Sequence, residues 1–139
     1  MVIGIAVACL LVCSCQKNKG MGERKFVQSL IRNGDIIANA IRRFHERKKR
    51  YPHRLEELKP NFLVASPSLG IEVKDGWFYT TRDDPFYGGW SLWVEIKPKF
   101  SSSRFSFGDV IAYHPSHRYH EEGYSGKLER IGNWAYYHE

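Results

Sequence analysis

The spacing of apolar residues changes midway along the chain, and this change constrains the fold more than any other feature. Up to residue 44 apolar residues recur every three or four positions, as in an α-helix with one face on a core. From residue 77 onward they alternate with polar residues, as in a half-buried β-strand. The length of 139 residues fits a single domain. We therefore predict an α+β fold, with one long N-terminal amphipathic helix packed on a small antiparallel β-meander of about four strands.

The helical pattern is interrupted once, at Asn33-Gly34-Asp35. This triplet is compatible with a break in which Asp35 caps a second helix. The apolar stripe stays in phase across it, so we expect one continuous helix, in which Gly34 costs about 1 kcal/mol. Tyr51-Pro52 ends the helix, because the residue before a proline disfavours the α region. The stripe consists of Phe26, Leu30, Ile37, Ile41 and Phe44.

Four later segments have the aromatic and β-branched composition of strands. Turn-forming Gly, Pro, Asp and Ser residues separate them, and 82–89 has the composition of a hairpin loop. We expect most of the large rings to fill a shallow core between helix and sheet. The predicted strands are 77–81, 90–97, 109–114 and 133–138.

An uncharged apolar run occupies residues 2–14, VIGIAVACLLVCS. It is shorter than the ~20 residues that a membrane-spanning helix needs, and it suits a signal peptide. Its end, Val12-Cys13-Ser14-Cys15, resembles a bacterial lipobox, which implies that Cys15 is acylated. We therefore expect a lipoprotein signal peptide at 1–14, a tether at 15–22 and the α+β domain at 23–139. The expected location is the bacterial cell envelope, lipid-anchored and facing the periplasm or exterior.

Other interpretations of the leader stay open. A plain transmembrane or cleaved secretory segment would also be apolar. Cys13 and Cys15 are too few to complete a soft-metal site, since a tetrahedral site needs four ligands and no histidine lies nearby.

Positive charge is concentrated in one segment. Residues 17–60 hold 13 Lys and Arg against 5 Asp and Glu, whereas residues 61–139 hold 8 against 10. A basic segment favours anionic surfaces. We expect no nucleic-acid partner, because the rings lie in the sheet and the cations in the helix, whereas nucleic-acid binding needs both together. The predicted basic surface consists of Arg42, Arg43, Arg47, Lys48, Lys49 and Arg50.

The segment 36–60, IIANAIRRFHERKKRYPHRLEELKP, resembles the end of the long helix and the following turn in the pilin and type II secretion pseudopilin G family. The resemblance implies a long helix on a small antiparallel sheet. It differs at the start, where a lipobox-like cysteine stands in place of the family's apolar helix of about 20 residues. The matching positions are Ile37, Ile41, Phe44, Tyr51, Pro52, Leu55 and Leu58.

The densest group of possible ligands is HPSHRYHEE, residues 114–122. His114, His117 and His120 are candidate zinc ligands, although Pro115 prevents a regular helix that would align them. The chain has no Gly-rich phosphate loop and no nucleophile elbow. We expect a non-enzymatic interaction or scaffolding module, possessing no cofactor, bound to the membrane by its lipid and to an envelope protein. The alternative is a metal-binding module that uses the histidine-rich loop.

Overall fold

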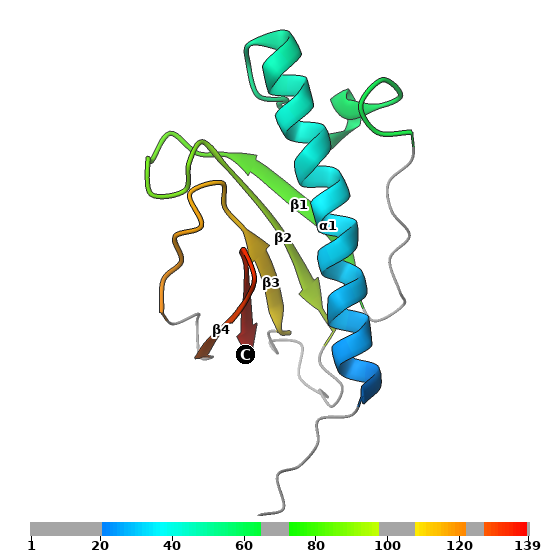
Figure 1. Ribbon diagram of the computed structural model, residues 1–139, viewed down its shortest axis with the longest axis vertical. Coiled ribbons are helices and arrows are strands. Elements are labelled where there is room, and N and C mark those ends of the chain that lie inside the picture. The colour runs from blue at the N-terminus through cyan, green and yellow to red at the C-terminus, as the bar shows by residue number, and fades with distance from the viewer. Residues whose placement is uncertain (1–20, 65–72, 98–107, 122–126, 139) are drawn as a thin grey trace, which may run out of the picture.

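The computed structural model describes residues 21–64, 73–97, 108–121 and 127–138 (Figure 1). This part of the chain forms one long helix and a five-stranded sheet, so the predicted α+β fold is confirmed. Helix α1 spans Met21–Lys48, and the short 3-10 helix η1 spans Leu55–Leu58. The strands are β1 (Val73–Thr81), β2 (Trp90–Ile96), β3 (Val110–Tyr113), β4 (Lys127–Ile131) and β5 (Trp134–His138).

The sheet has the order β1-β2-β3-β5-β4, and every neighbouring pair is antiparallel. The four predicted strands correspond to β1, β2, β3 and β5, which are adjacent in this order. The expected number of about four was one too few. The missed strand, β4, has the sequence KLERI, in which only Leu128 and Ile131 are apolar. Such a charged strand is typical of a sheet edge.

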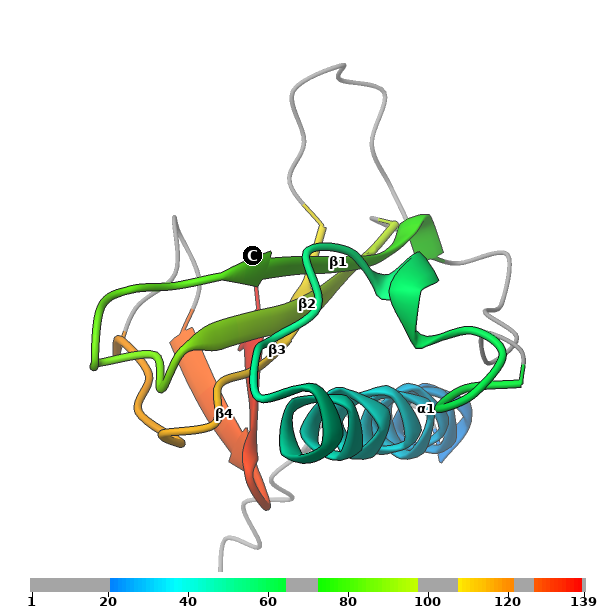
Figure 2. The same cartoon turned by 90° about the horizontal axis from the view of Figure 1, so that it is seen from above.

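Helix α1 covers one face of the sheet (Figure 2), and its axis follows the long axis of the molecule (Figure 1). Its inward side and the facing side chains of β2, β3 and β5 form one buried core. Alternation along the strands explains which strand residues belong to this core, because every second side chain points toward α1. The core comprises Val27, Leu30, Ile31, Ile37, Ala38, Ala40, Ile41 and Phe44 on α1, Leu58 and Leu63 after it, and Trp90, Leu92, Val94, Ile111, Tyr113, Trp134 and Tyr136 on the sheet.

The helix continues through Asn33-Gly34-Asp35, as predicted. Close packing explains why position 34 is a glycine. A Cβ atom placed on Gly34 would stand 2.6 Å from Trp134 Cζ2 and 2.8 Å from Trp77 Cη2. The Trp134 indole Nε1 also donates a hydrogen bond to Asp35 Oδ1, at 2.9 Å. Gly34 and Asp35 together therefore form the place where β5 docks on α1.

Candidate functional site

The three candidate zinc ligands lie in the connection between β3 and β4, and each packs against aromatic rings. The His114 ring stacks on Tyr119, with 4.9 Å between ring centroids. His117 Nε2 lies 3.1 Å from the Tyr113 hydroxyl. His120 stacks on Phe86 at 4.6 Å. His114 and His120 both contact the Tyr87 ring, whereas His117 faces Tyr113, so the spacing of three residues does not make the three imidazoles converge.

Within the described ranges, no group of three His, Cys, Asp or Glu side chains is placed to hold a metal ion. His114 is half-buried, and burial, followed by the nearby Arg82 charge, lowers its pKa to about 4. The imidazole is therefore neutral near pH 7. Its Nδ1 atom is buried without a hydrogen-bond partner.

The histidine-rich connection is fastened by polar contacts to the β1–β2 loop and to the β4–β5 turn. Ser116 Oγ donates a hydrogen bond to the Phe86 carbonyl. The Tyr119 hydroxyl accepts from the His114 backbone N–H at 3.1 Å and donates to the Asn133 carbonyl at 2.5 Å. Burial raises the pKa of Tyr119 to about 12, so this hydroxyl keeps its proton. These rings and hydroxyls thus have a visible structural task, which is to hold the β3–β4 connection against the β1–β2 loop and the β4–β5 turn.

The predicted basic surface divides into two groups of three. Arg42 Nη1 donates to the Tyr113 hydroxyl at 3.2 Å, and its Nη2 donates to Asn39 Oδ1 at 2.6 Å. Arg43 Nη2 donates to the Phe62 carbonyl at 2.8 Å. Arg50 pairs with Glu57 at 2.9 Å. The second group is exposed and forms no ion pair with another described residue: Arg47, Lys48 and Lys49.

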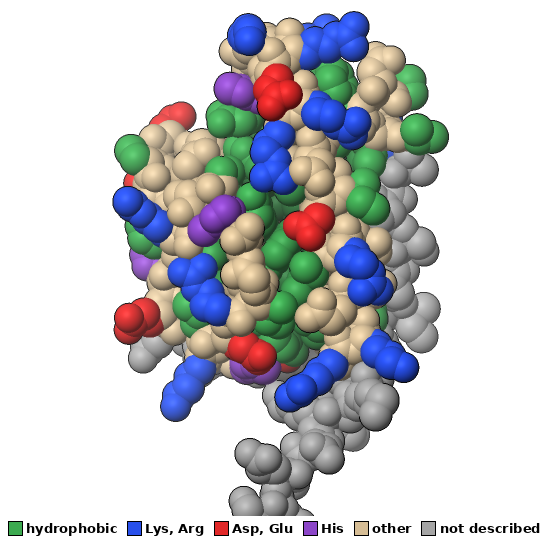
Figure 3. Space-filling view, in the orientation of Figure 1, with side chains coloured by type: hydrophobic (Ala, Val, Ile, Leu, Met, Phe, Trp, Pro, Cys, Tyr) green, Lys and Arg blue, Asp and Glu red, His purple; other side chains and the backbone are tan. Residues whose placement is uncertain are grey.

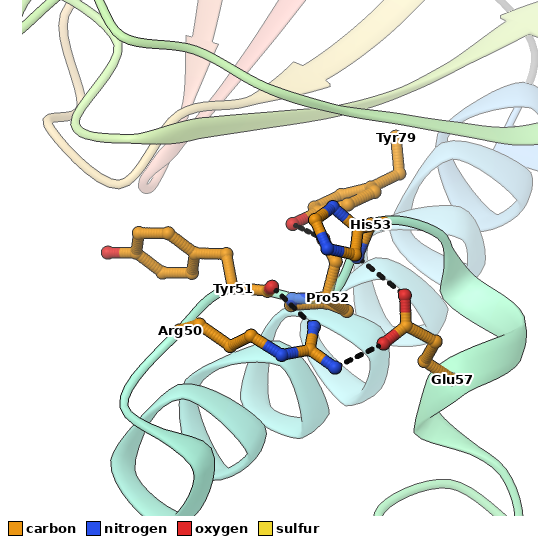
Figure 4. A network of polar contacts seen from close by, with 6 residues as sticks. All are labelled: Arg50, Tyr51, Pro52, His53, Glu57 and Tyr79. Atoms are coloured by element: carbon orange, nitrogen blue, oxygen red, sulfur yellow. Dashed lines mark hydrogen bonds and ion pairs between the residues drawn. The ribbon is translucent and has the colours of Figure 1, made fainter.

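Arg50 belongs to a network that fastens the chain after α1 to β1 (Figure 4). Glu57 accepts from Arg50 Nη2 and, at 2.8 Å, from the His53 backbone N–H. These contacts, the Arg50 hydrogen bond first, lower the pKa of Glu57. The Tyr79 hydroxyl donates to the Pro52 carbonyl at 2.9 Å, and burial raises the pKa of Tyr79. The network was not predictable from sequence, since its partners are up to 27 positions apart.

The Tyr51-Pro52 motif that carries the family resemblance lies in this junction. Pro52 is fully buried, and the Tyr51 ring stacks on His45 with 4.1 Å between centroids. Leu58 is fully buried in the core, and Leu55 packs against it. These residues therefore set how the chain leaves α1 and returns to the sheet.

An open groove of about 330 Å³ lies between the first turns of α1 and the β4–β5 hairpin. Val27, Ile131 and Tyr136 contribute its apolar part, and Figure 3 shows apolar side chains along the trough beside α1. On the rim, His138 Nε2 lies 2.7 Å from Glu129 Oε2. Charges of both signs line the rim, so the groove does not select an anionic or a cationic ligand.

Comparison with known proteins found no matching family model, no similar curated protein and no similar solved structure. Cys15, the predicted acylation site, lies outside the described residues. Within them, no helix combines the length and the apolar character needed to cross a bilayer. Function is therefore inferred from this chain alone.

Proposed function

We propose that this protein is a bacterial envelope lipoprotein of pseudopilin-like architecture. An acyl group on Cys15 tethers it to the membrane, and the folded domain acts as a non-enzymatic interaction or scaffolding module. Its partner would be another envelope component, such as part of a secretion or pilus-type assembly.

The observation that carries the proposal is the direction of α1. The helix begins at one end of the molecule's long axis and runs toward the other end (Figure 1). Met21, its first residue, follows Cys15 by six positions. Six extended residues span about 20 Å, so an acyl group on Cys15 would hold the start of α1 close to the membrane surface.

The junction after α1 supports the pseudopilin-like part of the proposal. In that family the resemblance implies a long helix followed by Tyr-Pro and a turn with paired leucines. Here Tyr51, Pro52 and Leu58 perform a packing task between helix and sheet, which is a reason to retain them in a domain of this architecture.

The interaction role rests on charge. Arg47, Lys48 and Lys49 are exposed at the last turn of α1 and beyond it. Cations at the carboxyl end of a helix are favoured by its dipole, and that preference alone would account for one or two of them. A larger group without acidic partners among the described residues suits an anionic partner surface.

Intact-mass analysis of the membrane fraction tests the proposal. The wild type is expected as a chain that starts at Cys15 and carries added acyl mass. Cys15→Ala is expected to lose both the processing and the added mass. Cys13→Ala is the matched control, because the lipobox alignment places Cys13 before the cut, and it should be processed and acylated normally. An unprocessed wild-type chain free in the cytosol would contradict the proposal.

A further inference from the structure

The outward side of α1 carries a row of basic side chains along most of its length. Lys25, Arg32, Arg43 and Arg47 are all exposed, and they follow one another at steps of 7, 11 and 4 residues. At 3.6 residues per turn these steps keep them within about 60° of one another around the helix axis. At 1.5 Å per residue the row is about 33 Å long. A row of this length fits an extended anionic surface better than a single small anion.

One apolar side chain lies within the row. Ile36 is 49% exposed, although it could be replaced by a polar residue without loss to the core. Its position around the helix falls between those of Lys25 and Arg47. Lys and Arg side chains beside a membrane are attracted to anionic lipid headgroups, and an exposed apolar side chain among them adds apolar area at the same surface.

One exposed carboxylate, Glu46, lies near the end of the row, but it forms no ion pair with a residue of the row. No ion pair joins Lys25, Arg32 or Arg47 to another described residue. Asp35 points to the sheet side instead, where it accepts the Trp134 hydrogen bond. Arg43 is held by the Phe62 carbonyl, a neutral partner that orients the guanidinium and leaves its charge in place. Figure 3 shows Lys and Arg side chains spread over this side of the molecule, with fewer Asp and Glu side chains among them.

We propose that α1 lies flat on an anionic phospholipid membrane through Lys25, Arg32, Ile36, Arg43 and Arg47, with the sheet facing away from the lipid. The inference rests on the proposed acylation of Cys15, which brings the start of α1 to the same surface. An upright helix would carry Arg47 about 33 Å farther from the membrane than Lys25. Charges interact little beyond the Debye length of about 8 Å at physiological ionic strength, so only the flat orientation uses the whole row.

Footprinting of the membrane-attached protein tests the orientation. The mature protein is reconstituted in phosphatidylcholine vesicles with or without phosphatidylglycerol, and hydroxyl-radical oxidation is measured by mass spectrometry. Oxidation of Ile36 is expected to fall several-fold when phosphatidylglycerol is present. Phe78 is the internal control, since it is 36% exposed and points away from the α1 side of the sheet. Equal Ile36 oxidation in the two lipids would overturn the inference.

Two charge-reversal variants distinguish the effect of the row from the effect of the protein's net charge. Lys25→Glu/Arg32→Glu/Arg47→Glu is expected to lose the lipid-dependent protection of Ile36. Lys59→Glu/Lys97→Glu/Arg118→Glu changes the net charge equally at three other exposed positions and should keep it. Loss of protection in both variants would show that net charge, not the row, is responsible, and would overturn the inference.

The case in which Cys15 is not acylated can be recognised separately. The chain then carries no acyl mass and does not bind pure phosphatidylcholine vesicles. In that case flotation of the full chain with phosphatidylglycerol vesicles is the readout. Binding that the row variant loses and the control variant keeps would sustain the inference. Absence of binding would overturn it.

Discussion

The two sides of α1 differ in how closely the fold specifies them. On the inward side, Ile37, Ala38 and Ile41 are at most 1% exposed, and Gly34 accommodates two indole rings. On the outward side, Ile36 and the basic row contact few other residues. Packing therefore determines the inward side residue by residue, whereas the fold places little constraint on which residues stand on the outward side.

The largest expected effect is on the inward side. Ile41→Ala should lower the free energy of unfolding by about 2–5 kcal/mol, because it leaves a cavity in the core. Ile36→Ala makes the same chemical change on the outward side, where it should alter stability by less than about 0.5 kcal/mol. Urea unfolding of both variants measures the difference. Similar losses for the two would show that the two sides are not distinct.

Gly34→Ala should lower the free energy of unfolding by about 1–3 kcal/mol, because the new methyl group overlaps the rings of Trp134 and Trp77. It should do so even though alanine favours a helix by about 1 kcal/mol over glycine. In a Trp134→Phe background, where the ring is smaller, the loss should be reduced. A stabilised Gly34→Ala single variant would contradict the close approach.

Asp35→Ala should cost about 1 kcal/mol, because it leaves the Trp134 indole N–H without its acceptor. Glu46→Ala is the matched control, an exposed acidic residue on the same helix, and should be neutral. Thermal unfolding checks both. An Asp35→Ala variant as stable as the control would mean that the hydrogen bond contributes nothing.

The half-buried His114 should make stability depend on pH. Its pKa is lowered from 6.5 to about 4 in the folded chain, so between these values the unfolded chain binds a proton that the folded chain does not. Stability should therefore fall as the pH drops from 6.5 toward 4. His114→Phe keeps the ring contacts and removes the titration, so its decline over this range should be shallower. Parallel declines for the two proteins would refute this assignment.

The smallest effects are expected on the basic row. Lys25→Ala, Arg32→Ala and Arg47→Ala should each change the free energy of unfolding by less than about 0.5 kcal/mol. Arg42→Ala should cost more, about 0.5–1.5 kcal/mol, because it removes the contact with the buried Tyr113 hydroxyl. A row variant that unfolds as readily as Arg42→Ala would indicate a structural role for the row.

The strong periodic signals in the sequence were sufficient for most of the fold. The in-phase stripe across Gly34 predicted the continuous helix, and the alternation in 90–97 predicted β2 to within one residue. Strand β4 was not predicted because its edge position leaves most of its side chains exposed. Its sequence therefore shows little alternation of apolar and polar residues. Its pairing partner β5 was found because it is central and buried.

The site residues were harder to predict because their partners are distant in sequence. The six cations of the predicted basic surface look alike in the sequence. In the structure, Arg42 contacts Tyr113, 71 positions later, and Arg43 contacts Phe62. The histidine spacing suggested that the three rings bind one zinc ion. His117 instead adopts a φ of 53°, and the turn at this residue prevents the three rings from converging. The outward row combines two properties, helical phase and exposure, and exposure is known only once the inward side is identified.

The close contact of Trp134 and Trp77 with Gly34 also determines how a mechanical force would pass through the molecule. One turn away on either side, Leu30 and Ala38 carry a side chain where the indole of Trp134 would have to sit, so α1 cannot slide along the sheet by a turn. Tension applied at the first turn of α1 would therefore reach β5 as shear at Trp134 and Asp35. Helix and sheet would move together as one piece when the chain is pulled from its amino-terminal end.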